Sequence, residues 1–324
     1  MSDLLFSSPS EARGEKSDLC TAKAWAAWRR RKTNMRQPAF AGMFYSGGKK
    51  ELEEQIKGCF VSKLGAGFPC KKSAATIVAA ITPHAGYPYS GACASHAYKA
   101  IAESQKPDLF VILGPSHQGA GSCVSLEDWK TPFGIAKVDR EFGKAFLKNS
   151  SIVADEQVHA NEHSIEVQLP FLQFIFSSFK FLPIIIGQDA SFKEIAAAIA
   201  KAAKQTRRKI AIIASSDFTH YGPSYGYTLQ GDAKQLMYKM DGEAIDAIKS
   251  LKPDKFLAHL KKYNAAICGA LPILALMEIL STINLNGKTR KNANTKAKLF
   301  KYYTSGDVVG DYTNAVGYAA MGFY

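Results

Sequence analysis

Three apolar segments of the sequence each end in a short loop that carries a histidine. The segments and their histidines are 76–82 with His84 in "PHAGY", 108–113 with His117 in "GPSH", and 209–215 with His220 in "SDFTH". Neutral imidazoles, joined by a carboxylate or a thiolate, are the usual protein ligands of a first-row metal such as iron(II), copper or zinc. Three histidines at equivalent positions therefore predict a metal site, if the strands bring their loops together.

A carboxylate and a thiol are available to complete such a site. Asp217 precedes His220 by three residues, a spacing that turns both side chains into one pocket if the loop begins a helical turn. Cys268 lies in "ICGALPILALMEIL", just ahead of an apolar helical stretch. Unpaired N–H groups at a helix start would favour its thiolate, and Gly269 leaves room for close approach. The alternatives are an inert buried cysteine and a His220 that only caps the loop by bonding to Asp217.

One shorter motif points to a different chemistry. "HANEH" (159–163) matches the H-x-x-E-H pattern of a zinc-peptidase class, which needs His159 and His163 one turn apart on one helix. Asn161 is a good N-cap residue, so we expect the helix to begin near it and to leave His159 outside. Glu162 and His163 can still line the pocket at that helix start.

The sequence lacks the signature motifs of serine hydrolases and of nucleotide-binding proteins. "GPSHQG" has Gln118 where a hydrolase elbow needs glycine. The sequence also contains no Walker motif and no strand-linked G-x-G-x-x-G. Nucleotide binding and serine hydrolysis are therefore not supported by any motif.

The elements that must position these residues alternate between strand and helix patterns. Besides the three strands above, we expect a strand at 180–187, helices at 91–104, 139–149, 163–177 and 191–205, two or three helices within 229–281, and antiparallel strands at 297–305 and 314–324. This alternation predicts a single α/β domain with a central mixed sheet flanked by helices. In such sheets ligands collect outside the carboxyl ends of the strands, where these histidines fall.

Composition narrows the class of protein further. The six cysteines form no C-x-x-C pair, which argues against a disulfide framework or a structural zinc site. No run reaches the roughly 18–20 apolar residues that span a bilayer, and the first residues do not resemble a signal peptide. We therefore expect a cytoplasmic protein that is not inserted in a membrane.

The charge distribution favours solvated surfaces over specific nucleic-acid binding. The net charge is +13, and the basic runs "WRRRK" (28–32), "KQTRRK" (204–209) and "KTRKNANTKAK" (288–298) lack the interleaved aromatic residues of a nucleic-acid platform.

Residues 1–34 contain few, scattered apolar residues, so we expect a flexible N-terminal extension before a folded domain at 35–324.

Seven ordered segments of the sequence resemble the Memo family. They are "RQPAFAGMFYSG", "PHAGYPYSG", "LGPSH", "NEHSIEVQLPFLQ", "SSDFTHYG", "ICG" and "YYTSGDVVGDYTNAVGYAA". The likeness runs from about Arg36 to Tyr324. It implies a fold like that of the class III extradiol ring-cleaving dioxygenases, which use non-haem iron. It also implies a pocket that binds iron(II) or copper through His84, His117 and Cys268.

The resemblance leaves the reaction open. One hypothesis is a metal-dependent redox or dioxygenase-like enzyme, in which Asp217 orients the site and His220 is an acid–base group. A thiolate is softer than the carboxylate of a facial triad and favours copper or redox chemistry. The alternative is a non-catalytic metal-sequestering or adaptor protein that binds an anionic or peptide partner. The resemblance also implies AMMECR-type and radical-SAM proteins as partners.

Overall fold

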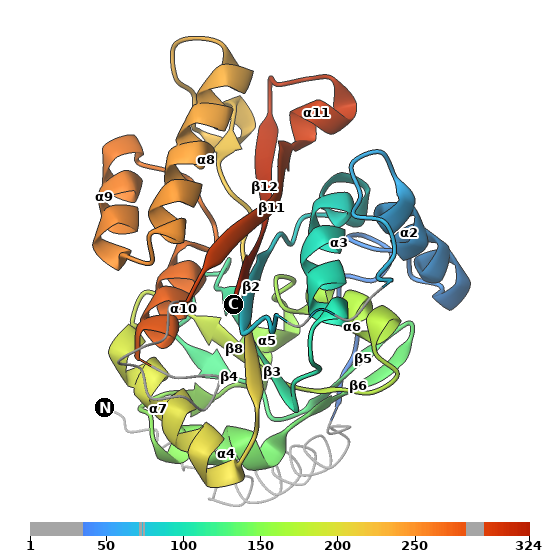
Figure 1. The fold of residues 1–324 in the computed structure, drawn as a ribbon, viewed down its shortest axis with the longest axis vertical. Helices are drawn as coiled ribbons and strands as arrows, with labels where there is room; N and C mark the ends of the chain where they lie inside the picture. The colour runs from blue at the N-terminus through green and yellow to red at the C-terminus, as the bar shows by residue number, and fades with distance from the viewer. Residues whose placement is uncertain (1–34, 71–72, 74, 283–294) are drawn as a thin grey trace, which may run out of the picture.

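One twelve-stranded mixed sheet with helices on both faces forms the framework of the protein (Figure 1). The computed structural model describes residues 35–70, 73, 75–282 and 295–324. The main path of the sheet runs in the order β1-β5-β6-β8-β3-β9-β2-β12-β10. The predicted single α/β domain with a central mixed sheet is thereby confirmed.

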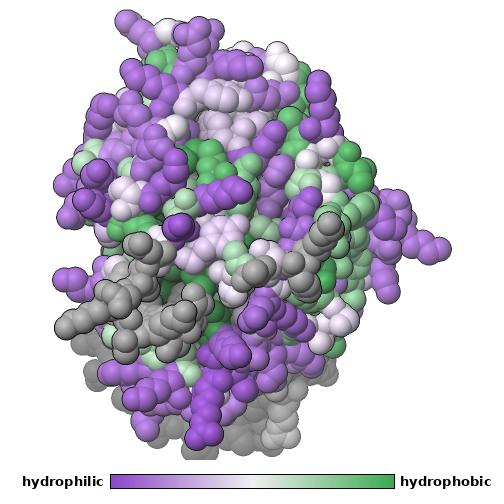
Figure 2. Space-filling view, viewed as in Figure 1, coloured by the Kyte–Doolittle hydropathy of each residue, from purple (hydrophilic) through white to green (hydrophobic). Residues whose placement is uncertain are grey.

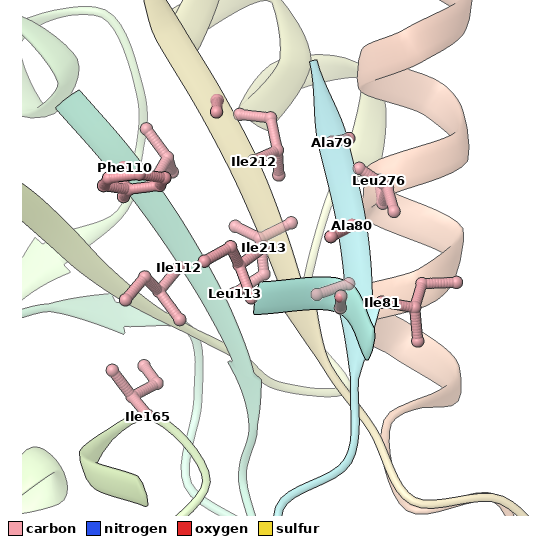
Figure 3. Close-up of a cluster of buried hydrophobic side chains, with 14 of the residues drawn as sticks. Ala79, Ala80, Ile81, Phe110, Ile112, Leu113, Ile165, Ile212, Ile213 and Leu276 are labelled. Carbon is pink, nitrogen blue, oxygen red and sulfur yellow. The ribbon is translucent and has the colours of Figure 1, made fainter. Parts of the chain in front are cut away.

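The centre of the sheet consists of four parallel strands in the order β8-β3-β9-β2. They are β2 (Ala79–Thr82), β3 (Leu109–Pro115), β8 (Lys180–Ile186) and β9 (Ile210–Ser215). All their residues except Lys180 are buried, which explains why the sequence shows continuous apolar runs here instead of alternation. Figure 3 shows Phe110 and Ile112 of β3 beside Ile212 and Ile213 of β9. Parallel pairing brings the carboxyl ends of these strands to one edge.

Helices cover both faces of this centre (Figure 1). On one face lie α2 (Lys49–Val61), α3 (Tyr87–Glu103) and α6 (Leu169–Ile175), and on the other lie α4 (Arg140–Lys148), α7 (Phe192–Thr206) and α10 (Ala270–Thr282). Helix α10 is apolar nearly all round because it packs between the sheet and α7. Leu276 of α10 lies against the sheet in the apolar cluster of Figure 3.

The C-terminal strands extend the sheet in the antiparallel sense. β11 (Ala297–Thr304) pairs with β12 (Ala315–Phe323), and β12 pairs with β2, which confirms the predicted antiparallel pair. The other strands are β1 (Met35–Arg36), β4 (Cys123–Val124), β5 (Asp128–Thr131), β6 (Gly134–Val138), β7 (Val153–Ala154) and β10 (His220–Tyr221). The other helices are α5 (Glu156–Ala160), α8 (Ala233–Lys249), α9 (Pro253–Tyr263), α11 (Ser305–Val309) and the short 3₁₀ helices η1 (Glu166–Gln168) and η2 (Pro223–Tyr225).

The predicted helix 163–177 is wrong in its first part, and so is the predicted N-cap at Asn161. Asp155 caps a helix instead, because its carboxylate accepts hydrogen bonds from the backbone N–H groups of Gln157 and Val158. That helix, α5, contains His159 and ends at Asn161. Residues 161–165 are a loop, and regular helix resumes only at η1 and α6.

Most of the visible surface is hydrophilic, with apolar side chains between the polar ones (Figure 2). Within the described residues, no helix is both long enough and apolar enough to cross a membrane. The predicted extension 1–34 lies outside the described residues, as does most of the basic run 288–298. The flexible extension at 1–34 and the solvated surface expected for the run 288–298 therefore stay predictions.

Candidate metal centre

Three loops meet at the carboxyl edge of the parallel strands. His84 follows β2 by two residues, His117 follows β3 by two, and Asp217 follows β9 by two. The ring centroids of His84 and His117 are 5.2 Å apart. The site reaches from the interior to the surface: His84 is 1% exposed, and the His117 side chain is 33% exposed.

A neutral hydrogen-bond relay fixes the tautomer of His84. Its Nδ1 lies 2.9 Å from Ser215 Oγ. The Ser215 hydroxyl donates to the carbonyl of Ser164 and accepts from Gln168 Nε2, so toward His84 it can only accept. His84 therefore carries its proton on Nδ1 and has a lone pair on Nε2. That Nε2 lies 3.0 Å from Cys268 Sγ.

Gln168 holds the relay in one orientation. Its Oε1 accepts hydrogen bonds from the hydroxyls of Thr82 and Tyr98. Its Nε2 donates to the carbonyl of Pro83 and to Ser215 Oγ. A flipped amide would place Oε1 against the carbonyl oxygen of Pro83, an acceptor against an acceptor, so the buried amide keeps one orientation.

A single carboxylate lies beside both His117 and His163. Glu162 Oε1 accepts a hydrogen bond from His117 Nδ1 at 2.9 Å, and His163 Nδ1 lies 3.5 Å from the same oxygen, with the two rings stacked at 4.4 Å. Burial raises the pKa of Glu162, but its bonds from His117 and from the backbone N–H of Ser164 outweigh this and bring it to about 2. An ionised carboxylate only accepts, so Nδ1 of His117 bears a proton and its Nε2 is left with a lone pair.

His220 is held by backbone carbonyls instead. Its Nδ1 lies 3.0 Å from the carbonyl oxygen of Phe218 and 3.1 Å from that of Ala266, so Nδ1 donates and Nε2 carries the lone pair. The helical turn expected from Asp217 to His220 is wrong. His220 lies in β10, which pairs antiparallel with β12. The Asp217 carboxylate instead accepts hydrogen bonds from the backbone N–H groups of His84 and Ala85.

Cys268 reaches the site because its neighbour has no side chain. A Cβ on Gly269 would lie 2.3 Å from Ser216 Cβ and 2.6 Å from the carbonyl oxygen of Ser215, so no larger residue fits without displacing the end of β9. The expected helix-start effect on the thiol is wrong. Helix α10 begins only at Ala270. Burial, with the nearby Asp217 carboxylate, raises the pKa of Cys268 well above its ordinary value.

Ligand atoms gather in two groups, each with all its atoms within 4.8 Å of one another. One group is His84, His117 and His163, and the other is His84, Asp217 and Cys268. His84 belongs to both, so the predicted set His84, His117 and Cys268 spans the two. Burial favours the neutral form of His84 and His163, as metal ligation requires. It lowers the pKa of His84 and, with the nearby His117, brings that of His163 to about 4.

His159, the other histidine of the peptidase-like motif, lies apart from both groups. It is fully buried, with its ring 5.6 Å from that of Trp129. Neither ring nitrogen has a hydrogen-bond partner within the described part of the chain. The motif therefore does not place His159 and His163 on one helical face, as the zinc-peptidase arrangement would need.

Sequence reasoning missed the residues that orient the imidazoles. Ser215 was assigned to the end of a strand and Gln168 to an apolar helix, with no role in the site. The usable signal is weak: each is a polar residue within an apolar stretch, "IAIIAS" and "EVQLPF". A buried polar side chain needs hydrogen-bond partners, so such a residue is a candidate for orienting a neighbouring side chain.

The whole length of the folded region matches known proteins. A family described as Memo-like protein matches residues 36–322. The chain belongs to the Memo family. A MEMO1 family protein of Methanopyrus kandleri is 39% identical over 302 residues, covering 89% of this chain and 98% of the relative. A MEMO1 family protein of Methanosarcina barkeri is 40% identical over 292 residues, covering 89% and 99%. One of Nitrosopumilus maritimus is 39% identical over 297 residues, covering 89% and 99%.

The donor atoms of this Memo protein suit a transition metal. Imidazole nitrogen and thiolate sulfur are ligands that iron, copper and zinc accept, whereas magnesium and calcium prefer oxygen. His84, His117 and His220 each have Nδ1 hydrogen-bonded to a protein group, which is the arrangement that second-shell groups impose on metal-binding histidines. The residues present therefore fit the metal that the resemblance implies.

Proposed function

We propose that this Memo protein binds one iron(II) or copper ion through His84, His117 and Cys268 and uses it in redox chemistry. The observation that carries the proposal is the 3.0 Å approach of His84 Nε2 to Cys268 Sγ, with Nδ1 already committed to Ser215. The Cys268 thiol can donate its proton to the lone pair of His84 Nε2, so a cation that displaces this proton would be shared by both atoms.

The chain's own residues have distinct roles in this proposal. A metal held by His84, His117 and Cys268 would supply one-electron chemistry. Asp217 holds the loop after β2 through the N–H groups of His84 and Ala85, so it orients His84. The free Nε2 of His220 can accept a proton from the substrate and return it, while the carbonyls of Phe218 and Ala266 keep the ring in place.

Metal binding is tested by anaerobic titration with iron(II) and copper(I), followed by elemental analysis. Cys268→Ser should lower the affinity for copper(I) strongly and that for iron(II) less, because the thiolate is the soft ligand. Cys123→Ser, at a buried cysteine outside both groups of ligand atoms, is the matched control and should bind both ions like the wild type. A metal content that survives the loss of both His117 and Cys268 would contradict the proposal.

Turnover is tested separately at His220. His220→Gln should keep the metal and the melting temperature while ascorbate-driven consumption of dioxygen falls by roughly 10²–10⁴-fold, the usual contribution of acid–base catalysis. If the variant loses its metal, or if its residual turnover follows metal occupancy, His220 is structural.

A second candidate function is metal holding without turnover. The crowding of donors favours it, because His84, His117, His163, Asp217 and Cys268 together offer more ligands than a catalytic ion uses. An adaptor role with an anionic or peptide partner belongs to the same alternative. Metal-loaded wild-type protein that consumes no dioxygen with ascorbate and yet keeps its ion against a chelator would favour this function.

Location and partners complete the proposal. The absence of C-x-x-C pairs and of any disulfide pattern supports a cytoplasmic protein, and fractionation of cells checks this directly. Family membership alone supports AMMECR-type or radical-SAM proteins as partners, and copurification with tagged protein checks that association.

A further inference from the structure

His163 has the position of a metal ligand, although it lies outside the predicted set His84, His117 and Cys268. Its ligand atom lies within 4.8 Å of those of His84 and His117. Its ring is parallel to the His117 ring to within 28°, and its Nδ1 lies 3.5 Å from the Glu162 oxygen that accepts from His117. With Nδ1 beside Glu162, Nε2 lies on the far side of the ring, where it can bind an ion.

The loop that carries His163 is fixed in place from several sides. The guanidinium of Arg36 donates to the backbone carbonyl of Glu162 and forms a buried ion pair with Glu166. Behind His163, the ring of Phe44 packs at 4.5 Å. Gly114 allows the loop to approach β3, because a Cβ there would lie 2.5 Å from Ser164 Oγ.

We propose that His163 is a metal ligand, and that His84, His117 and His163 form a three-nitrogen face beside Cys268. This inference rests on the proposed metal-binding function and extends it to a residue outside the predicted set. Imidazole nitrogen suits zinc(II), which also accepts thiolate, whereas the soft ion copper(I) prefers the sulfur. The two faces share His84, so the chemistry of the ion decides which face holds it.

The rival explanation is that His163 only fills space between Phe44 and His117. A packing residue needs a flat ring and no nitrogen. The variant His163→Phe keeps the ring and removes both nitrogen atoms, so it separates the two explanations. His96→Phe is the matched control, because His96 is a half-buried histidine of α3 outside both groups of ligand atoms.

Zinc(II) is the first probe, because its binding involves no redox change. Competition with a chromophoric chelator should show zinc(II) affinity reduced by at least about 10-fold in His163→Phe, since even second-shell losses have that effect. X-ray absorption of the zinc(II) protein should show three imidazoles in the wild type and two in the variant. His96→Phe should match the wild type in both measurements.

Copper(I) gives the crossed comparison. Cys268→Ser should weaken copper(I) more than zinc(II), and His163→Phe should weaken zinc(II) more than copper(I). If His163→Phe keeps the wild-type zinc(II) affinity and imidazole count, His163 is not a ligand, while the proposed function stands. If the wild type binds neither ion, the proposed function and this inference both fall. Should phenylalanine lower the melting temperature, His163→Gln repeats the measurement with a polar side chain, and the same outcomes decide.

Discussion

The metal centre has two sides, a strand side with His84 and a loop side with His117 and His163. The two sides anchor their histidines by different means. On the strand side, His84 is buried and its Nδ1 donates to the neutral hydroxyl of Ser215, which Gln168 holds. On the loop side, His117 and His163 are less buried and share the ionised carboxylate of Glu162. Both sides present Nε2, but only one uses a charge to do so.

The difference follows from the surroundings of each side. A charged group beside His84 would be buried at the sheet edge and would need an opposite charge to compensate it. The hydroxyl of Ser215 and the amide of Gln168 are neutral and satisfy each other by hydrogen bonding. A carboxylate raises the basicity of the imidazole that it accepts from, so His117 is the stronger metal ligand. The strand side therefore fixes the position of its histidine, and the loop side strengthens the binding of His117 to a metal.

The largest expected effect is on stability, from breaking the strand-side relay. Gln168→Met should lower the free energy of unfolding by about 3 kcal/mol, because the buried hydroxyl of Thr82 loses its acceptor and the hydroxyls of Tyr98 and Ser215 each lose one hydrogen bond. Urea denaturation measures this. The control Gln173→Met, at a half-buried glutamine on α6, should lose about 1 kcal/mol. Equal losses would mean that the relay is no more important than an ordinary amide contact.

The next effect is on metal affinity, from neutralising the loop side. Glu162→Gln should weaken zinc(II) binding by about 10–100-fold, because it removes the charge that orients His117 and lies beside His163. Isothermal titration with zinc(II) measures the change. Glu156→Gln is the control, since the Glu156 carboxylate accepts hydrogen bonds from Ser125 and Leu126, away from both groups of ligand atoms. The account is contradicted if the two variants bind zinc(II) equally well.

The smallest effect concerns His159, a buried histidine that lacks such an anchor. Burial, with the charge of Arg36, lowers the pKa of His159 from 6.5 to about 3. As the pH falls below about 6.5 the unfolded chain therefore takes up the proton and the folded protein does not, so stability decreases by about 1 kcal/mol between pH 7 and pH 5.5. His159→Phe should remove this share of the loss, as measured by urea denaturation at both pH values.

A control separates this titration from simple loss of packing. Phe181→Leu alters the same cluster, since the ring of Phe181 lies 5.7 Å from that of Trp129. It should lower stability at both pH values and keep the wild-type difference between them. If His159→Phe also keeps that difference, His159 is protonated as easily in the folded protein as in the unfolded chain.

The sequence was sufficient to predict the sheet and the edge at which the site lies. Continuous apolar runs such as 209–215 can be satisfied only in a sheet covered on both faces, so the strands of β3 and β9 were foreseeable. The loop 161–165 was not, because its apolar neighbours resemble a helix. Its shape is set by long-range contacts, chiefly Arg36 bonding to the carbonyls of His159 and Glu162.

The orientation of the imidazoles was also beyond the sequence. Which nitrogen of His84 faces Cys268 depends on the hydroxyl of Ser215, which in turn depends on Gln168 from a different element. Such a chain of hydrogen bonds joins residues far apart in sequence and leaves no periodic pattern. The favoured thiolate expected for Cys268 was wrong because α10 begins only at Ala270 and burial raises the pKa of the thiol.

The central claim is that the histidines of this site bind a metal through Nε2, with Nδ1 held by the protein. The most direct test is an anomalous diffraction map, at the iron edge, from crystals prepared with iron(II) in the absence of oxygen. The account predicts one strong peak roughly 2.0–2.3 Å from His84 Nε2, with further contacts from His117, Cys268 or His163. A peak bound through Nδ1 atoms, or one located away from His84, would contradict it.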